Sequence, residues 1–134
     1  MSVSAVLDTN VIVAALLSKN DDAATVKILD AAMDGRITPL YHEDILTEYA
    51  EVLHRQKFHF REETIQKVFT AIRYYGREIF PVSTGKTLLD EDDQIFYDVA
   101  VRGRAYLVTG NLRHYPPENF IVSPAQMALL IDVP

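Results

Sequence analysis

Three acidic residues stand where the pattern of the sequence calls for apolar ones. Asp8 ends the apolar run 3–7, which predicts a buried strand, and a second apolar run follows within three residues. Glu48 lies in the apolar stripe of a predicted helix, and Asp93 leads the apolar face of another. A carboxylate on an inward face must be paired, protonated or bound to a metal ion, because burying it alone is costly. These positions are therefore the first candidates for chemistry.

Each acid also has a purely structural interpretation. Asp8 suits the N-cap of the helix that follows it. Glu48 suits a buried ion pair with an arginine. Asp93 suits the N3 partner of an N-cap at Asp90. The sequence leaves these alternatives open, whereas Asp98, which points away from the apolar face of its helix, is expected to contact water.

Taken together, the three acids indicate a metal site. The chain has no cysteine and no evident histidine pair, and three of its histidines, 42, 54 and 59, show no ligand spacing. Carboxylate oxygens without thiolate or a histidine pair are hard ligands, which favour Mg²⁺ or Mn²⁺ over zinc. Such an ion activates bound water for hydrolysis of a phosphodiester, and a second ion about 4 Å away stabilises the leaving oxygen.

The elements that must position these residues follow from periodicity and from capping residues. Strands and helices alternate along the chain, which predicts a mostly parallel sheet covered on both faces and joined by right-handed crossovers. We expect Asp21 to cap the second helix, Gly35 to end it, and Ser123 to open a capping box with Gln126. The predicted strands are 3–7, 36–41, 78–83, 105–111 and 120–123, and the predicted helices are 10–18, 22–35, 42–55, 61–76, 91–103 and 124–132.

In an open parallel sheet, ligands bind outside the carboxyl ends of the strands. Asp8, Thr9 and Asn10 follow the first strand, and Thr109 and Asn111 end the fourth. Both groups therefore belong to one edge of the sheet, and we expect the first strand to lie in its middle. Pro39 places its own strand near an edge or its end.

Composition and charge bound the class of protein. The chain of 134 residues forms a single domain, residues 1–134, and its apolar runs are too short to cross a membrane. It has no signal-peptide pattern, so we expect a soluble, cytoplasmic protein. A net charge of −6 argues against nucleic-acid binding by bulk electrostatics. Metal ions held by clustered acids reverse the local field, so a nucleic-acid substrate is not excluded.

Four segments resemble the PIN domains, which are metal-dependent ribonucleases of an α/β/α type. They are "VLDTNVIVAAL", "ILTEYAEVL", "DEDDQIFYDVA" and "YLVTGNLRHYP", in the order and spacing of that family. The resemblance covers essentially the whole chain and implies one PIN-like domain, a three-layer α/β/α sandwich with a mostly parallel sheet of four to five strands. It is greatest to the prokaryotic branch regarded as toxins of toxin–antitoxin pairs.

The resemblance also implies roles for particular residues. Within the family, four acidic positions line the metal site, and three of them fall on Asp8, Glu48 and Asp93. The fourth is Asn111, whose carbonyl oxygen can still coordinate an ion but brings no charge. The resemblance therefore does not decide whether the site holds one or two ions of Mg²⁺ or Mn²⁺.

Further polar residues receive supporting roles from the same resemblance. Thr9, Asn10 and Thr109 would orient the acids, with ordinary capping as the alternative for the two threonines. Arg113 and His114 follow the site and are candidates to bind RNA phosphate. The alternative for these two residues is an ordinary solvated loop. Arg102 and Arg104 are candidates to extend that basic rim, although a plain surface position is the favoured interpretation for both.

The function expected is an endoribonuclease that acts on single-stranded RNA, as the toxin of a pair with an antitoxin protein. The family suggests a homodimer, for which the helix 62–75 offers an apolar surface. The alternative is a catalytically weak PIN-type module that binds RNA or protein, which Asn111 supports. Phosphotransfer through a covalent Asp8 ranks lower, because Asn10 stands where that chemistry wants a second aspartate.

Overall fold

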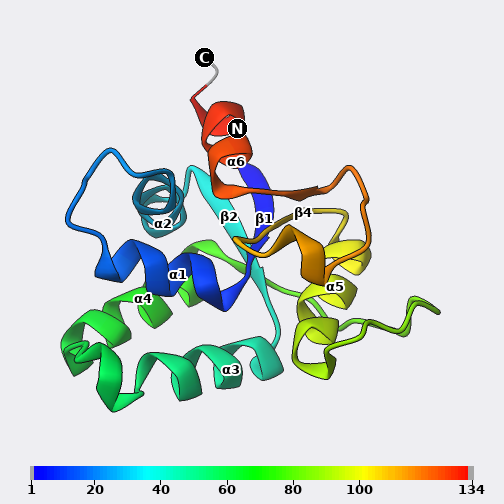
Figure 1. The fold of residues 1–134 in the computed structure, drawn as a ribbon, viewed down its shortest axis with the longest axis horizontal. Coiled ribbons are helices and arrows are strands. Elements are labelled where there is room, and N and C mark those ends of the chain that lie inside the picture. The colour runs from blue at the N-terminus through cyan, green and yellow to red at the C-terminus, as the bar shows by residue number, and fades with distance from the viewer. Residues whose placement is uncertain (1, 133–134) are drawn as a thin grey trace.

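A central parallel sheet with helices on both faces organises residues 2–132, the part of the chain that the computed structural model describes (Figure 1). Its five strands are ordered β3-β2-β1-β4-β5, and all four neighbouring pairs are parallel. The predicted three-layer α/β/α sandwich is therefore confirmed, with β1 in the middle of the sheet. The strands are β1 Val3–Leu7, β2 Ile37–Tyr41, β3 Arg77–Glu78, β4 Tyr106–Val108 and β5 Ile121–Val122.

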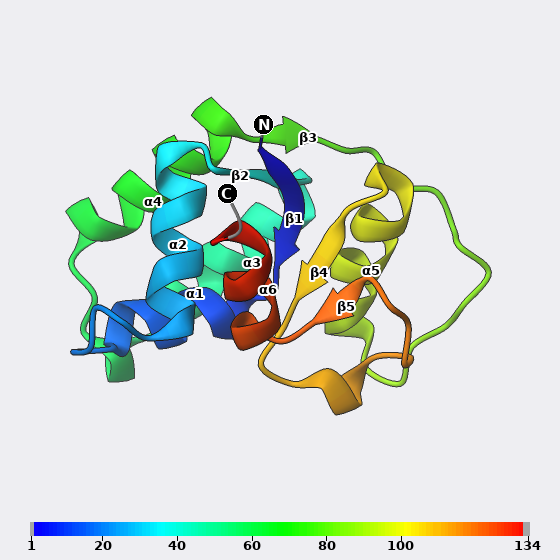
Figure 2. The ribbon, with the colours of Figure 1, turned by 90° about the horizontal axis from the view of Figure 1, so that it is seen from above.

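Within residues 2–132, six α-helices cover the sheet. In Figure 2, α1, α2 and α4 lie to one side of the strands and α5 lies to the other. The helix α6 packs on α2, and α3 contacts α1, α4 and α5. The helices are α1 Thr9–Leu17, α2 Ala24–Asp34, α3 Glu43–Leu53, α4 Glu62–Tyr75, α5 Glu91–Gly103 and α6 Pro124–Ile131, with short 3₁₀ turns η1 Gln56–Phe58 and η2 Leu112–His114.

The central strands are apolar because both of their faces are covered by helices. Ala5 and Val6 of β1 and Leu107 and Val108 of β4 are fully buried, as expected for the middle of a parallel sheet. Close packing on both faces holds their register, since a slip of one residue would exchange side chains of different size between the two faces. The residues that follow β1 and β4 are consequently held side by side.

Some helix ends agree with the sequence and one does not. Gly35 ends α2 in the left-handed conformation, at φ 87°, and Ser123 forms the predicted capping box with Gln126. The expected cap at Asp21 is wrong, because α2 begins at Ala24. The Asn20 side chain instead accepts a hydrogen bond from the Asp22 amide, at 2.9 Å, and the resulting turn delays the helix.

The strand predicted over 78–83 is also largely wrong. Only Arg77 and Glu78 pair, opposite Leu40 and Tyr41 of β2, and the last amide to join the sheet is that of Ile79. A proline two residues later has no N–H for a ladder. The strand β2 itself is internal, because it lies between β3 and β1. β3 pairs only with Leu40 and Tyr41, so Pro39 has no β3 residue opposite it. The edge position expected for Pro39 therefore applies to that residue and not to the whole strand.

Among the helices of residues 2–132, none is long and apolar enough to cross a membrane.

Candidate metal centre

Asp8 lies at the carboxyl end of the central strand with its side chain buried. It is 6% exposed, and its Oδ2 accepts hydrogen bonds from the Thr109 hydroxyl, at 2.9 Å, and the Tyr115 hydroxyl, at 3.0 Å. Asp8 occupies the N-cap position of α1, as the capping interpretation expects, but its side chain makes no cap hydrogen bond to that helix. A hydrogen bond from the Thr9 amide acts on the carboxylate in addition to the two hydroxyl groups. Capping alone therefore does not account for this buried carboxylate.

Sheet register brings the partners of Asp8 to it. Leu7 pairs with Val108 across the β1–β4 ladder, and the Asp8 amide donates to the Val108 carbonyl at 2.9 Å. Thr109, the residue directly after β4, is fully buried, and its hydroxyl donates to the Asp8 carboxylate. Its Oγ1 also accepts from the Asn111 amide, at 3.0 Å, which fixes the direction of the hydroxyl.

The other two residues expected to support the acids behave differently. Asn10 Oδ1 accepts a hydrogen bond from the Gly110 amide, at 2.9 Å, so its side chain holds the loop after β4. Thr9 is buried, and its hydroxyl has no hydrogen-bond partner within residues 2–132. Of the three residues predicted to orient acids, only Thr109 donates to one.

Asp93 is buried in the first turn of α5 and is 9% exposed. Its Oδ2 is fully enclosed and has no hydrogen-bond partner in the described part of the chain. Asp90 caps the helix, accepting from the Asp92 amide at 2.9 Å. The capping interpretation therefore holds for Asp90, whereas capping does not account for the buried Oδ2 of Asp93.

Glu48 is half-buried on α3, which packs against the end of β1. The hydroxyl of its neighbour Tyr49 donates to the Leu7 carbonyl, and this bond fixes α3 beside Asp8. None of the ion pairs in residues 2–132 includes Glu48. A buried ion pair with arginine is thus not the reason for this acid.

The three acids share one electrostatic environment. Burial raises the pKa of Asp8, and hydrogen bonds from two hydroxyl groups oppose the rise. Burial raises the pKa of Asp93, and the negative charge of Asp8 raises it further. Burial also raises the pKa of Glu48, with smaller contributions from nearby carboxylates that include Asp8. Mutual repulsion of this kind is relieved by a bound divalent cation.

The residues after β4 form the open side of this region. Asn111, Arg113 and His114 are exposed, and His114 Nδ1 lies 3.4 Å from Asp93 Oδ2. A hollow of about 580 Å³ opens here, lined by residues 89–92, Arg113 and His114. Arg102 lies in the last turn of α5 and Arg104 at its C-cap, both at the opposite end of the helix, so neither extends this rim and the favoured interpretation as plain surface residues stands.

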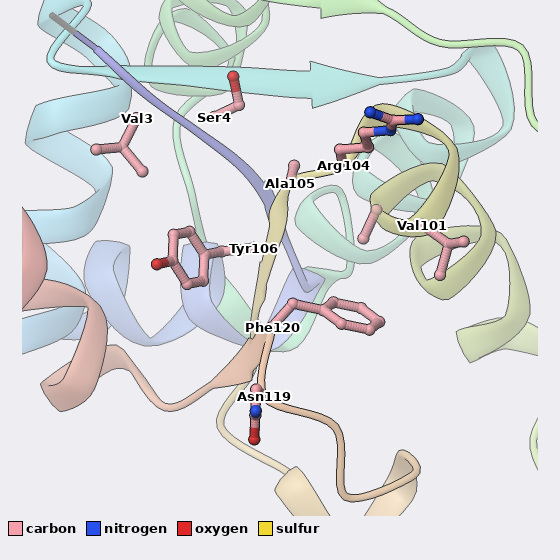
Figure 3. Close-up of a pocket in the computed structure, with 9 residues that line it drawn as sticks. Val3, Ser4, Val101, Arg104, Ala105, Tyr106, Asn119 and Phe120 are labelled. Atoms are coloured by element: carbon pink, nitrogen blue, oxygen red, sulfur yellow. The ribbon is translucent and has the colours of Figure 1, made fainter.

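A second hollow, of about 720 Å³, lies at that opposite end. Arg104 lines it together with Val3, Tyr106 and Phe120, at the start of β1 and β4 and just before β5 (Figure 3). None of the predicted site residues lines this hollow. The acids and this hollow occupy opposite edges of the sheet.

Two residues of the region, Tyr115 and Asp90, make contacts that the sequence pattern does not predict, and a third, Asp98, differs from its prediction. Tyr115 donates to Asp8 and directly follows the segment 109–114, which is polar except for Leu112 and Gly110, and this position is the signal in the sequence that points to it. Asp90 was considered only as a cap, yet its carboxylate lies with Asp93 and His114 in a group whose donor atoms are all within 4.8 Å of one another. Asp98, expected to face water, is half-buried and accepts from two neighbouring side chains.

The donor set fits a divalent cation. A buried acceptor oxygen without a partner, that of Asp93, lies near the carboxylate of Asp8 and beside further carboxylate and imidazole donors. Oxygen-rich groups of this kind hold Mg²⁺ or Mn²⁺.

Comparisons with known proteins agree with this arrangement. A family model described as PIN domain matches residues 4–113. An uncharacterized protein of Methanocaldococcus jannaschii is 30% identical over 114 residues, which are 83% of this chain and 72% of the relative. The crystal structure of VapBC2 from Rickettsia felis bound to a DNA fragment from their promoter aligns with a TM-score of 0.53 and 16% identity, covering 90% of this chain and 96% of that one. At such low identity the structural likeness concerns the fold alone.

Proposed function

This chain belongs to the PIN domain family, and from that premise we propose that it is a metal-dependent endoribonuclease that hydrolyses phosphodiester bonds of single-stranded RNA. The observation that carries the proposal is the carboxylate of Asp93, whose buried Oδ2 has no hydrogen-bond partner within residues 2–132 and which lies near Asp8. The neighbour of this oxygen at ion-pair distance is His114, whose Nδ1 lies 3.4 Å away. A buried carboxylate oxygen without a hydrogen bond is costly, and a bound divalent cation removes that cost.

The ligands proposed for a Mg²⁺ or Mn²⁺ ion are Asp8, Glu48 and Asp93. Such an ion, when bound, activates water and neutralises charge on the scissile phosphate. Thr109 and Tyr115 both donate to Oδ2 of Asp8. This leaves Oδ1 as the oxygen for the ion and holds the carboxylate in one orientation, which improves a ligand by reducing the entropy lost on binding.

The substrate is proposed to approach from the exposed side of the site. Arg113 and His114 line the hollow there and are placed to contact the phosphates of RNA. Asn111 lies at the start of the same turn and contributes a neutral carbonyl oxygen. Asn10 acts indirectly, because its side chain accepts from the Gly110 amide and so holds the loop that carries these residues.

The biological setting is proposed from the family and from the fold. VapBC2 of Rickettsia felis, which has a similar fold, was crystallised on a DNA fragment from its promoter. We infer that this chain is the toxin of a toxin–antitoxin pair, a single cytoplasmic domain that binds an antitoxin protein. Its proposed homodimer uses α4, whose Tyr74 is 78% exposed.

A cleavage assay tests the activity directly. Wild-type protein, Asp8→Asn and the surface control Asp30→Asn are incubated with unstructured and structured RNA, in Mn²⁺ and in EDTA. We expect wild type and the control to cleave unstructured RNA in Mn²⁺, leaving 5′-phosphate and 3′-hydroxyl ends, and Asp8→Asn to be inactive. Equal cleavage by Asp8→Asn would show that the site is wrong. Cyclic 2′,3′-phosphate ends would exclude hydrolysis by metal-activated water.

A second function, a module that binds RNA or protein without effective catalysis, is favoured by one observation. The position of the family's fourth acid is the neutral and exposed Asn111. Calorimetric titration of Mn²⁺ into wild type and Asp93→Asn separates the two functions. The module predicts no tight metal binding for the substitution to weaken, whereas the nuclease predicts binding that Asp93→Asn reduces.

A further inference from the structure

A histidine and two aspartates meet at the entrance of the site. The donor atoms of Asp90, Asp93 and His114 all lie within 4.8 Å of one another. Two of them, Asp90 and His114, are outside the set of residues that the family pattern places on the metal. The three come from the start of α5 and from η2, so the tertiary fold assembles them.

The separation of two of these donors suits a shared cation. His114 Nδ1 lies 3.4 Å from Asp93 Oδ2, the enclosed oxygen that has no hydrogen-bond partner in the described residues. Two ligands bound at about 2.1 Å to one ion lie roughly 3.0 Å apart at a right angle and roughly 3.4 Å apart at a tetrahedral angle. The two atoms therefore already stand at the spacing of neighbouring ligands.

The third donor is held in place by helix capping. Asp90 Oδ1 accepts from the Asp92 amide, at 2.9 Å, which orients the carboxylate and leaves Oδ2 free of that bond. The first turn of α5 thus presents one fixed and exposed carboxylate, that of Asp90, and one buried carboxylate, that of Asp93.

His114 reaches this place through the 3₁₀ turn that starts at Asn111. The His114 amide donates to the Asn111 carbonyl, at 3.0 Å, closing one turn. Three residues complete a turn of 3₁₀ helix, so residues three apart lie on the same side. The imidazole consequently emerges beside the position where the family pattern expects a fourth acid and this chain has an amide.

The group is also accessible. Asp90 and His114 both line the hollow of about 580 Å³ beside the site. Two of the three donors are therefore reached from solvent, and the third, Asp93, lies directly behind them.

We propose that Asp90, Asp93 and His114 form a second cation position beside the Asp8–Glu48–Asp93 site, replacing the ligand lost at Asn111, and that it selects Mn²⁺ over Mg²⁺. The inference rests on the proposed function in one respect, since Asp93 is shared by both positions. An imidazole nitrogen suits transition metals, whereas Mg²⁺ prefers oxygen ligands and retains its waters. The exchange of an acid for a histidine therefore changes the metal preference as well as the charge.

Electron paramagnetic resonance of Mn²⁺ bound to the full chain tests the proposal without an activity assay. Wild type, His114→Ala, Asp90→Asn, Asp8→Asn and the control His54→Ala are titrated with Mn²⁺, and nitrogen coupling to the bound ion is measured by pulsed methods. Asparagine caps helices as well as aspartate does, so Asp90→Asn removes the charge without removing the cap. His54 lies at the end of α3 and pairs with Glu62.

We expect two bound Mn²⁺ ions in wild type, one of them with nitrogen coupling that persists in Asp8→Asn and His54→Ala. In His114→Ala the coupling should vanish. Affinity at that position should fall by at least the roughly tenfold that loss of an outer-sphere partner causes, and excess Mg²⁺ should displace Mn²⁺ from it more easily. Asp90→Asn should weaken the same position only.

Three results would overturn the inference. Mn²⁺ binding without nitrogen coupling, or coupling that survives in His114→Ala, would remove His114 as a ligand and leave the proposed nuclease site intact. Equal preference for Mg²⁺ and Mn²⁺ in wild type and His114→Ala would remove the selectivity. No Mn²⁺ binding by wild type would remove both metal positions and with them the metal-dependent nuclease.

Discussion

Asp93→Asn is expected to make the metal-free protein more stable, although it removes a proposed ligand. In the wild type the enclosed Oδ2 of Asp93 has no hydrogen-bond partner within residues 2–132, and the negative charge of Asp8 acts on it. Asparagine fills the same volume without the charge. Neutralisation therefore relieves repulsion that the wild-type fold tolerates when no ion is bound.

The size of the effect follows from the contacts. A buried acceptor without a partner costs roughly 1–3 kcal/mol, and more when it is charged. Because asparagine keeps a polar amide in the same place, we expect a net gain of about 1 kcal/mol in the free energy of unfolding. For a chain of this length that raises Tm by about 3–5 °C. Mn²⁺ at about 100 times its Kd stabilises the wild type by about 2.7 kcal/mol, so the order of the two proteins should reverse in Mn²⁺.

Thermal unfolding in EDTA and in Mn²⁺ measures both effects. The matched control is Asp98→Asn, the same change on the same helix. The Asp98 carboxylate accepts from Thr84 Oγ1 at 3.2 Å and from Gln94 Nε2 at 3.0 Å, so its neutralisation relieves nothing. We expect Asp98→Asn to gain no stability and to keep the response to Mn²⁺. If Asp93→Asn is less stable than wild type in EDTA, the carboxylate has a structural role and the reasoning is refuted.

Three other outcomes are expected. Tyr115→Phe removes a hydroxyl that donates to Asp8 at 3.0 Å. Calorimetry should show that the affinity for Mn²⁺ is reduced about 10- to 100-fold. An unchanged affinity would contradict the orienting role of Tyr115. Because burial raises the pKa of Asp8, the native state binds its proton more tightly than the unfolded state does. Urea midpoints in EDTA should therefore fall as the pH rises from about 4 through that raised pKa, and a rising midpoint would count against it. Gly76→Ala should lower the free energy of unfolding by about 1–3 kcal/mol. The reason is that a Cβ there would lie 2.5 Å from the Pro39 carbonyl oxygen and closer still to the Ile72 carbonyl oxygen. An unaltered urea midpoint would contradict this and show that the backbone moves to make room.

Most of the fold could be predicted from the sequence because its signals are local. Periodicity placed all six helices, and apolar runs placed four of the five strands within a few residues. The failures came where a distant segment decides. The run 78–83 has the composition of a strand, yet strand β3 extends only as far as β2 offers partners before a proline intervenes. Asp21 resembles a cap, but Asn20 closes a turn first.

Asp8, Glu48 and Asp93 could be selected from the sequence for the same reason. Each interrupts an apolar pattern, and that pattern records which residues face inward. It does not record their partners. The hydroxyl groups that bind Asp8 belong to Thr109 and Tyr115, about a hundred residues further along the chain, and only the parallel pairing of β1 with β4 brings them together.

The surroundings of the acids were decided by the tertiary structure. The sequence makes Arg104 a candidate for the rim of Arg113, but it lies at the far end of α5, a helix of 13 residues that spans roughly 20 Å. The sequence makes His114 a candidate for RNA phosphate or an ordinary loop residue, and the structure places its Nδ1 3.4 Å from Asp93 Oδ2. A sequence encodes which side chains are buried, because burial depends on local periodicity. Which of them meet depends on sheet register and on the direction of turns, and these are set by packing between segments far apart in the chain.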